Sequence, residues 1–106
     1  MAATSLSVGG AQAQVFIDNT TAIPISGSAN NSSTENVDFG DVDLDGDWDA
    51  IFADGGDDGN DQNRIWINQG GLQGGTVGNF VDATIARFPQ IPQTGRDIEF
   101  VDFDDD

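Results

Sequence analysis

The chain has 106 residues, enough for one domain at most, and 19 acidic against three basic residues give it a formal net charge of −16. It has no cysteine, which excludes disulfides and cysteine-based metal sites. It has no basic stripe that could meet nucleic-acid phosphates or an anionic membrane surface, and no apolar run long enough to cross a bilayer. We therefore predict neither nucleic-acid binding nor membrane insertion. Abundant glycine and the lack of a sustained helical apolar period favour short strands and turns.

Residues 1–13 are treated as a separate N-terminal segment. Its end, Ala11-Gln12-Ala13, fits the small-residue cleavage site of a signal peptide. The charged start and the apolar core of such a peptide are missing, so a signal remnant is the alternative interpretation. Residues 15–22 begin with the apolar run Val15-Phe16-Ile17 and continue to Ala22, which predicts a strand that ends before Pro24. A polar loop rich in Ser, Asn and Gly follows over residues 26–34.

Residues 41–49 carry an aspartate at every second position: Asp41, Asp43, Asp45, Asp47 and Asp49. Gly46 stands among them and permits the sharp turn that would aim their oxygens inward. Each carboxylate pair about 5 Å apart costs on the order of 3 kcal/mol at an effective dielectric near 20, a penalty that a bound cation removes. An all-oxygen set with flexible spacing suits Ca²⁺ rather than zinc or copper. We predict side-chain binding by Asp41, Asp43, Asp45 and Asp49, and binding by Asp47 through its backbone carbonyl; the alternative is a solvated turn without metal.

The residues on either side of this loop predict strands. Val37 and Phe39 alternate with polar residues before the loop, and the short apolar run 50–53 follows it. An EF-hand needs a glutamate at position twelve and flanking helices, whereas position twelve here is Phe52. The sequence therefore predicts a calcium-stapled β-hairpin with strands at residues 36–40 and 49–54.

The second half of the chain continues the pattern of short strands. The acidic turn at residues 55–62 is expected to be a solvated loop tip, with a second weak ion site as the alternative. Residues 64–68 form a predicted strand that is apolar on both faces, so neighbouring layers should cover it and Trp66 should lie in the core. We expect Trp48 to pack over the hairpin rather than stack on a ligand. Further strands are predicted at residues 79–85 and 97–103.

An internal repeat accounts for this layout. Phe16 and Asp18 recur as Phe80 and Asp82 with an offset of 64. The five residues Val37, Phe39, Asp41, Asp43 and Asp45 recur as Ile98, Phe100, Asp102, Asp104 and Asp106 with an offset of 61. Such a period with four strands per unit is typical of propeller blades and similar all-β arrays. We predict a complete repeat over residues 35–95. The last strand of a preceding partial repeat and its loop would occupy residues 14–34, and the first strand and truncated calcium loop of the next would occupy residues 96–106.

Three motifs resemble the VCBS/FG-GAP class of β-propeller repeats. They are Val-Asp-Phe-Gly-Asp-Val-Asp-Leu-Asp-Gly-Asp-Trp-Asp at residues 37–49, Asn-Arg-Ile-Trp-Ile-Asn-Gln-Gly at residues 63–70, and Gly-Asn-Phe-Val-Asp-Ala-Thr at residues 78–84. The resemblance implies an all-β, antiparallel four-stranded propeller-blade-like unit. It also implies Ca²⁺ in the first loop and a secreted or cell-surface location. Members of the class carry several repeats in a closed ring, whereas fewer than two are present here.

The resulting expectation is a calcium-binding, extracellular structural or adhesion module that joins copies of itself head to tail into a ring or filament. At such a junction, Asp102, Asp104 and Asp106 would complete a second calcium site with oxygens from the neighbour. The alternative is a calcium-dependent propeller fragment that binds a glycan or a protein, with Trp48 or Trp66 at the site. A further alternative is a non-catalytic piece of a propeller enzyme. We do not predict an enzyme, since the chain has no His, Lys, Cys or Tyr to act as a tuned base or nucleophile.

Overall fold

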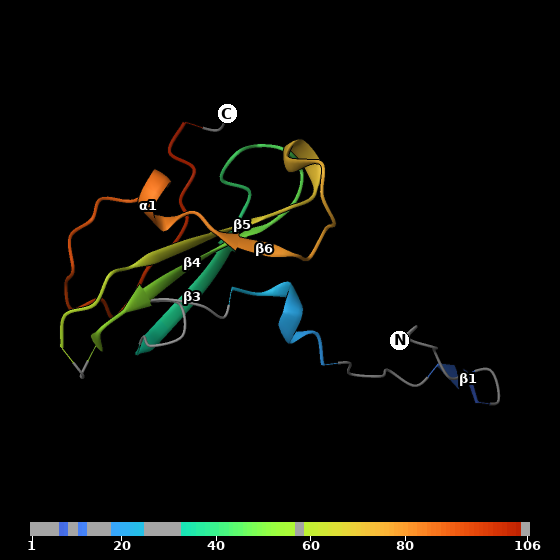
Figure 1. The fold of residues 1–106 in the computed structure, drawn as a ribbon, viewed down its shortest axis with the longest axis horizontal. Helices are drawn as coiled ribbons and strands as arrows, with labels where there is room; N and C mark the ends of the chain where they lie inside the picture. The colour runs from blue at the N-terminus through green and yellow to red at the C-terminus, as the bar shows by residue number, and fades with distance from the viewer. Residues whose placement is uncertain (1–6, 9–10, 13–17, 25–32, 57–58, 105–106) are drawn as a thin grey trace.

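The computed structural model describes residues 7–8, 11–12, 18–24, 33–56 and 59–104. Its central element is a four-stranded antiparallel sheet in the order β3-β4-β5-β6 (Figure 1). These strands are β3 (Thr34–Gly40), β4 (Asp49–Asp54), β5 (Arg64–Asn68) and β6 (Phe80–Asp82). A small hairpin of β1 (Ser7–Val8) and β2 (Ala11–Gln12) precedes them. Short helical turns are η1 (Thr20–Ala22), η4 (Gly71–Gln73) and α1 (Thr84–Arg87). The expected all-β class with one antiparallel four-stranded sheet is confirmed.

The strand register places the aspartate loop at one end of the sheet. Gly40 pairs with Asp49, so β3 and β4 form a hairpin whose connection is residues 41–48. Ala50 pairs with Trp66, and Trp66 pairs with Asp82, which extends the row across all of β4, β5 and β6. The predicted strands at residues 36–40, 49–54 and 64–68 are confirmed. The first of them, β3, begins two residues earlier than predicted, at Thr34, and its register is irregular between Thr34 and Asn36.

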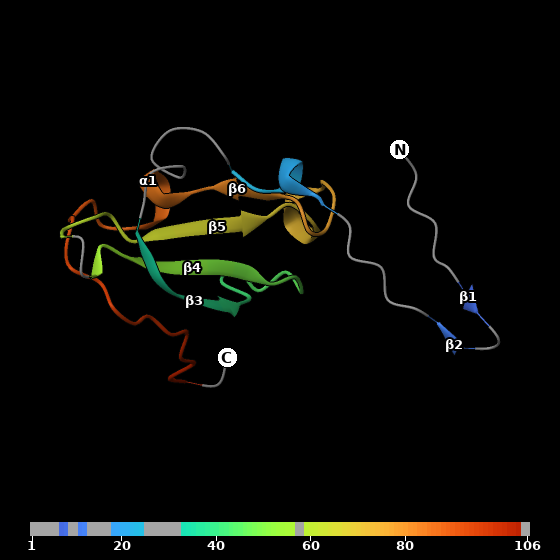
Figure 2. The same cartoon turned by 90° about the horizontal axis from the view of Figure 1, so that it is seen from below.

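The apolar core lies on one face of the sheet. It consists of Ile51, Ile65 and Ile67, against which the partly buried Phe88, Ile98 and Phe100 pack. Figure 2 shows how the chain after α1 passes from the β6 edge to the β3 edge of the sheet. Backbone bridges between Asp61 and Gln93 and between Gly55 and Gly95 hold this returning segment. One face of the sheet is therefore covered by the C-terminal part of the same chain.

The strand predicted at residues 15–22 is wrong for the part of it that the structure describes. Residues 15–17 lie outside the described residues, and residues 20–22 form η1 instead of a strand. The side chain of Asp18 accepts a hydrogen bond from the backbone N–H of Thr20 at 3.1 Å. Such a local side-chain bond offers the backbone an alternative to a sheet ladder. The apolar run that predicted the strand carries no information about this local hydrogen bond.

The predicted strand at residues 79–85 is only half right. The strand β6 ends at Asp82, and α1 begins at Thr84. Asp82 Oδ1 accepts a hydrogen bond from the N–H of Thr84 at 2.9 Å, and the buried Thr84 hydroxyl accepts one from the N–H of Ile65 at 3.1 Å. These bonds to side chains turn the chain away from the sheet and start the helical turn.

The segment at residues 97–103 does not form the predicted strand. The N–H of Phe100 donates to the carboxylate of Asp38 at 2.8 Å, so the segment meets β3 through a side chain rather than through a backbone ladder. The Phe100 ring lies directly against Gly40, at a place where any side chain would collide with it. Ile98 and Phe100 of this segment thus pack on the sheet face instead of extending the sheet.

Candidate metal centre

The loop between β3 and β4 is shaped by its own aspartates. Asp41 Oδ1 accepts a hydrogen bond from the N–H of Asp45 at 2.9 Å, and its Oδ2 accepts one from Gly46 at 2.8 Å. Gly46 has φ of 95°, as the sequence predicted for the sharp turn, and Leu44 also adopts a positive φ of 59°. A non-glycine residue in this left-handed region is uncommon. The loop therefore holds a tight curl around the side chain of Asp41.

Asp49 connects this curl to the sheet. It is the first residue of β4 and is completely buried. Its Oδ2 accepts a hydrogen bond from the N–H of Val42, and its Oδ1 accepts one from the N–H of Asn68, both at 2.9 Å. Burial raises the pKa of Asp49, while these two hydrogen bonds act in the opposite direction. One carboxylate thus ties the aspartate loop to β5.

The five predicted aspartates converge. Within the described residues, two groups of three carboxylates bring ligand atoms within 4.8 Å of one another: Asp41, Asp43 and Asp49, and Asp43, Asp45 and Asp47. Asp43 belongs to both groups. The carboxylate of Asp47 points into the cluster, whereas the sequence assigned only its backbone carbonyl to the ion. The alternating spacing found these residues without identifying which atom of Asp47 faces the others.

The cluster holds carboxylate oxygens that are enclosed and unsatisfied. Asp47 is only 8 % exposed. Both of its carboxylate oxygens, and Oδ1 of Asp43, receive no hydrogen bond from the described part of the chain. Burial, together with the neighbouring carboxylates of Asp45, Asp49 and Asp43, raises the pKa of Asp47 to about 6. The pKa of Asp45 is lowered overall. Burial acts to raise it, but the hydrogen bonds that Asp45 accepts from the N–H groups of Leu72 and Asp47 outweigh the effect of burial.

This donor set fits a hard cation. Carboxylate oxygens in a flexible loop are the ligands of Ca²⁺, while zinc and copper sites draw on nitrogen and sulfur ligands that this loop does not offer. Enclosed anionic oxygens without partners are costly unless a charge or a donor meets them. A cation among Asp43, Asp45 and Asp47 would satisfy them.

The residues that cover this loop were not predicted from the sequence. Asn68, at the end of β5, donates from Nδ2 to the carbonyl of Trp48 at 3.0 Å, and its Oδ1 accepts the N–H of Gly78 at 2.8 Å. The turn between β5 and β6 lies on the carboxylates: Leu72 N–H donates to Asp45 Oδ2 at 2.7 Å, and Gln73 Nε2 donates to Asp43 Oδ2 at 2.5 Å. This turn is rich in glycine, with Gly70, Gly71, Gly74, Gly75 and Gly78, which lets its backbone approach the carboxylates closely.

The other predicted site residues stay outside the two carboxylate groups, although Asp102 lines a pocket together with Asp41 and Leu44 of the aspartate loop. Asp102 and Asp104 are exposed, and among the residues that the structure describes neither joins a carboxylate cluster; the N–H of Asp104 donates to Asp102 Oδ1 at 3.3 Å. Asp106 lies outside the described residues. Asp61 of the acidic turn lies 3.6 Å from Arg64 and joins no described cluster either, whereas Asp57 and Asp58 lie outside the described residues.

The two tryptophans differ in their surroundings. Trp66 is half-buried and packs on Phe52 with ring centroids 4.4 Å apart. It lies on the sheet face opposite the apolar core, so its expected place in the core is wrong. Trp48 does not pack over the hairpin as expected, since it is 68 % exposed. Asp47 and Asp49 turn inward on either side of it, so alternation along the chain directs the Trp48 side chain outward.

No protein-family model, curated protein or solved structure significantly matches this chain. The resemblance to VCBS/FG-GAP repeats therefore stays a prediction. Among the described residues, no helix has the length and apolar character needed to cross a membrane.

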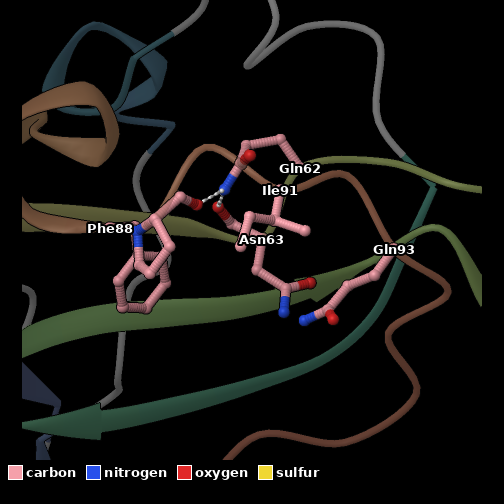
Figure 3. A pocket seen from close by; sticks show the side chains of 6 residues that line it. Gln62, Asn63, Phe88, Ile91 and Gln93 are labelled. Atoms are coloured by element: carbon pink, nitrogen blue, oxygen red, sulfur yellow. Dashed lines mark hydrogen bonds between the residues drawn. The ribbon is translucent and has the colours of Figure 1, made fainter.

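A pocket of about 170 Å³ lies away from the aspartate loop, between the start of β5 and the returning segment (Figure 3). It is lined by Gln62, Asn63, Phe88, Pro89, Ile91 and Gln93. Gln62 Nε2 donates to the carbonyls of Asn63 at 2.8 Å and Pro89 at 2.9 Å. The Gln62 side chain thus links the returning segment at Pro89 to the start of β5, which indicates a structural role for this residue.

Proposed function

We propose that this chain is a calcium-binding structural module in which one Ca²⁺ staples the β3–β4 hairpin. The observation that carries the proposal is the set of enclosed carboxylate oxygens on Asp43 and Asp47 that no donor from the described chain satisfies. A cation at this point would cancel the repulsion among the aspartates and hold the curled loop against β5. Because the ligands are spread over one loop, binding of the ion and folding of the loop are coupled.

We further propose an extracellular location and a propeller-blade-like role. Calcium sites in extracellular modules have Kd values of roughly 10⁻⁴ to 10⁻³ M, which suits millimolar but not cytosolic calcium. The four-stranded antiparallel sheet and the repeat motifs support the blade interpretation. No catalytic role is proposed.

Self-assembly is the second part of the proposal. Val37 and Phe39 lie on the face of β3 opposite the apolar core and are 43 % and 50 % exposed. They are the repeat equivalents of Ile98 and Phe100, which do pack on a sheet face. We propose that copies of the chain join head to tail through this exposed face, as a structural or adhesion array.

Calcium titration of the purified chain tests the metal proposal. At a calcium concentration of 100 times Kd, binding to the native state alone adds about 2.7 kcal/mol to the free energy of unfolding. We expect a higher melting temperature in millimolar calcium than in EDTA, and loss of this difference in Asp43→Asn. Asp97→Asn is the matched control, because Asp97 is exposed and outside the loop. Equal melting of the wild-type chain with calcium and with EDTA would reject the proposal.

A glycan-binding role is the second candidate, favoured by the exposure of Trp48 beside the aspartate loop. An exposed aromatic ring next to a calcium site suits stacking against a sugar. Glycan-array binding that requires calcium and is lost in Trp48→Ala would support it, and an array without any bound glycan would rule it out for the glycans tested.

A further inference from the structure

Hydrogen bonds distinguish the two carboxylate groups that share Asp43. In the first group, both oxygens of Asp41 and both of Asp49 accept backbone N–H groups and so hold the shape of the loop. In the second group, both oxygens of Asp47 and one of Asp43 are enclosed and receive no donor from the described chain. More carboxylate oxygens are left without a partner in the second group than in the first. A cation is therefore best placed among Asp43, Asp45 and Asp47, where it would meet these oxygens.

The turn between β5 and β6 closes directly over this second group. The backbone N–H of Leu72 donates a hydrogen bond to Asp45, and the side-chain amide of Gln73 donates one to Asp43. A side chain added at Gly70 would lie 2.6 Å from Asp47 Oδ2, and one added at Gly71 would lie within 2.5 Å of the Asp45 carboxyl group. The glycines at these two positions let the backbone of the turn approach the carboxylates.

Gln73 carries an unused ligand atom at this place. Its Nε2 donates to Asp43, while its Oε1 is enclosed and accepts no hydrogen bond within the described residues. The orphaned oxygen belongs to a residue outside the aspartate loop, so it is independent of the alternating pattern. Side-chain amide oxygens are regular ligands of Ca²⁺.

We propose that Gln73 Oε1 is a ligand of the cation held by Asp43, Asp45 and Asp47, and that binding thereby fixes the turn at residues 70–78. The inference rests on the calcium-binding function proposed above and adds a ligand from a second loop. Calcium would then join the β3–β4 connection to the β5–β6 connection and order the whole end of the sheet, rather than stapling a single hairpin.

Two substitutions at Gln73 separate a ligand from a mere hydrogen-bond donor. Gln73→Met keeps the length of the side chain and removes both the oxygen and the donor. Gln73→Glu removes the donor to Asp43 but keeps an oxygen that can bind the ion. Thr76→Ala is the matched control, because Thr76 is an exposed residue of the same turn. Calcium affinity is measured by isothermal titration calorimetry, and protection of the turn by hydrogen exchange with and without calcium.

For Gln73→Met we expect a Kd for calcium about 10-fold to 100-fold weaker than that of the wild-type chain. We also expect the calcium-dependent protection of residues 70–78 to disappear. Gln73→Glu should bind calcium at least as tightly as the wild-type chain, and the calcium affinity of Thr76→Ala should be unchanged.

Three results would overturn the inference. One is equal calcium affinity in Gln73→Met and the wild-type chain. Another is weaker binding by Gln73→Glu than by Gln73→Met, which would mark Gln73 as a donor only. A third is a turn whose exchange is insensitive to calcium while the aspartate loop becomes protected. If the wild-type chain binds no calcium at all, the proposed function itself fails, which is a different outcome. Should Gln73→Met not fold, Gln73→Glu and the exchange of the wild-type turn still decide the question.

Discussion

At the scale of single residues, Asp47 shows the most strongly altered acid–base behaviour in the loop. Its carboxylate is buried beside Asp45, Asp49 and Asp43, and its pKa is raised from 3.8 to about 6. Burial and like charge both favour the protonated acid. A proton and a cation are therefore alternative ways to relieve the same repulsion, so the stability of the metal-free chain and its calcium affinity should respond to pH in opposite directions.

We predict that the melting temperature of the metal-free chain rises as pH falls from about 7 through 6 towards 4. In this interval the native state binds more protons at Asp47 than the unfolded state does, so acid favours the native state. The increase in melting temperature caused by calcium should shrink over the same interval, because the ion must displace the proton. Differential scanning calorimetry at several pH values, with calcium-saturated and metal-stripped protein, checks both trends. A calcium effect of equal size at pH 5 and pH 7.5 would contradict this prediction.

At the scale of the secondary-structure elements, a buried polar cluster connects β3, β4 and β5. Asp54 at the end of β4 and Arg64 at the start of β5 are completely or almost completely buried, and Arg64 Nε lies 3.7 Å from Asp54 Oδ2. Asp54 Oδ1 accepts the hydroxyl of Thr34 on β3 at 2.6 Å. Burial raises the pKa of Asp54 even though the Thr34 hydroxyl and Arg64 act to lower it. The charge of Arg64 is thus needed to hold a carboxylate at this depth.

We predict that Arg64→Leu lowers the free energy of unfolding by about 3 kcal/mol at pH 7, since it leaves a buried carboxylate without its cation. The loss should be smaller at pH 5, because the raised pKa of Asp54 lets the native state take up a proton as pH falls. Adding Asp54→Asn to Arg64→Leu should recover part of the stability. Urea unfolding of the single and double variants measures this coupling. Strictly additive losses would show that the two side chains do not stabilise each other.

The elements that the sequence predicted well are those with local signals. Alternation in β3, the apolar run of β4 and the aspartate spacing between them located the hairpin and the five converging carboxylates. The misses depended on contacts between distant residues or on single side-chain hydrogen bonds. Residues 97–103 alternate like a strand, yet the position of Phe100 depends on Gly40 and Asp38, some sixty residues away. Gln73 carries no pattern of its own, and only the folded turn brings it to Asp43.

At the scale of the whole molecule, the two faces of the sheet differ in how they are covered. The face formed by Ile51, Ile65 and Ile67 is covered by Ile98 and Phe100. On the opposite face, the pairing of Phe39 with Ala50 and of Ala50 with Trp66 puts Phe39 in the same row as Trp66. Phe39 remains half exposed there. Val37 and Phe39 of β3 correspond to Ile98 and Phe100 in the predicted repeat, so β3 of a second copy has the apolar side chains needed to cover the same face.

We predict that the calcium-loaded chain associates reversibly and that Phe39→Asp weakens the association at least about tenfold, equivalent to about 1.4 kcal/mol. The substitution places a charge in the apolar contact through which one copy would meet the next. Ile85→Asp is the control, since Ile85 is 88 % exposed and lies on α1, outside the sheet. Sedimentation velocity over a range of concentrations measures the effect.

The contact is heterologous, because the β3 face of one copy meets a different face of the next. It therefore closes into a ring where the rotation permits and otherwise continues as a filament, which the limiting sedimentation coefficient distinguishes. Ile98 and Phe100 of the same chain already pack on the apolar face and so compete with a second copy for it. Phe100→Ala weakens this intramolecular packing and should therefore strengthen association at the same calcium concentration. A monomer at every concentration, or equal effects of Phe39→Asp and Ile85→Asp, would show that the exposed face of β3 does not join one copy to another.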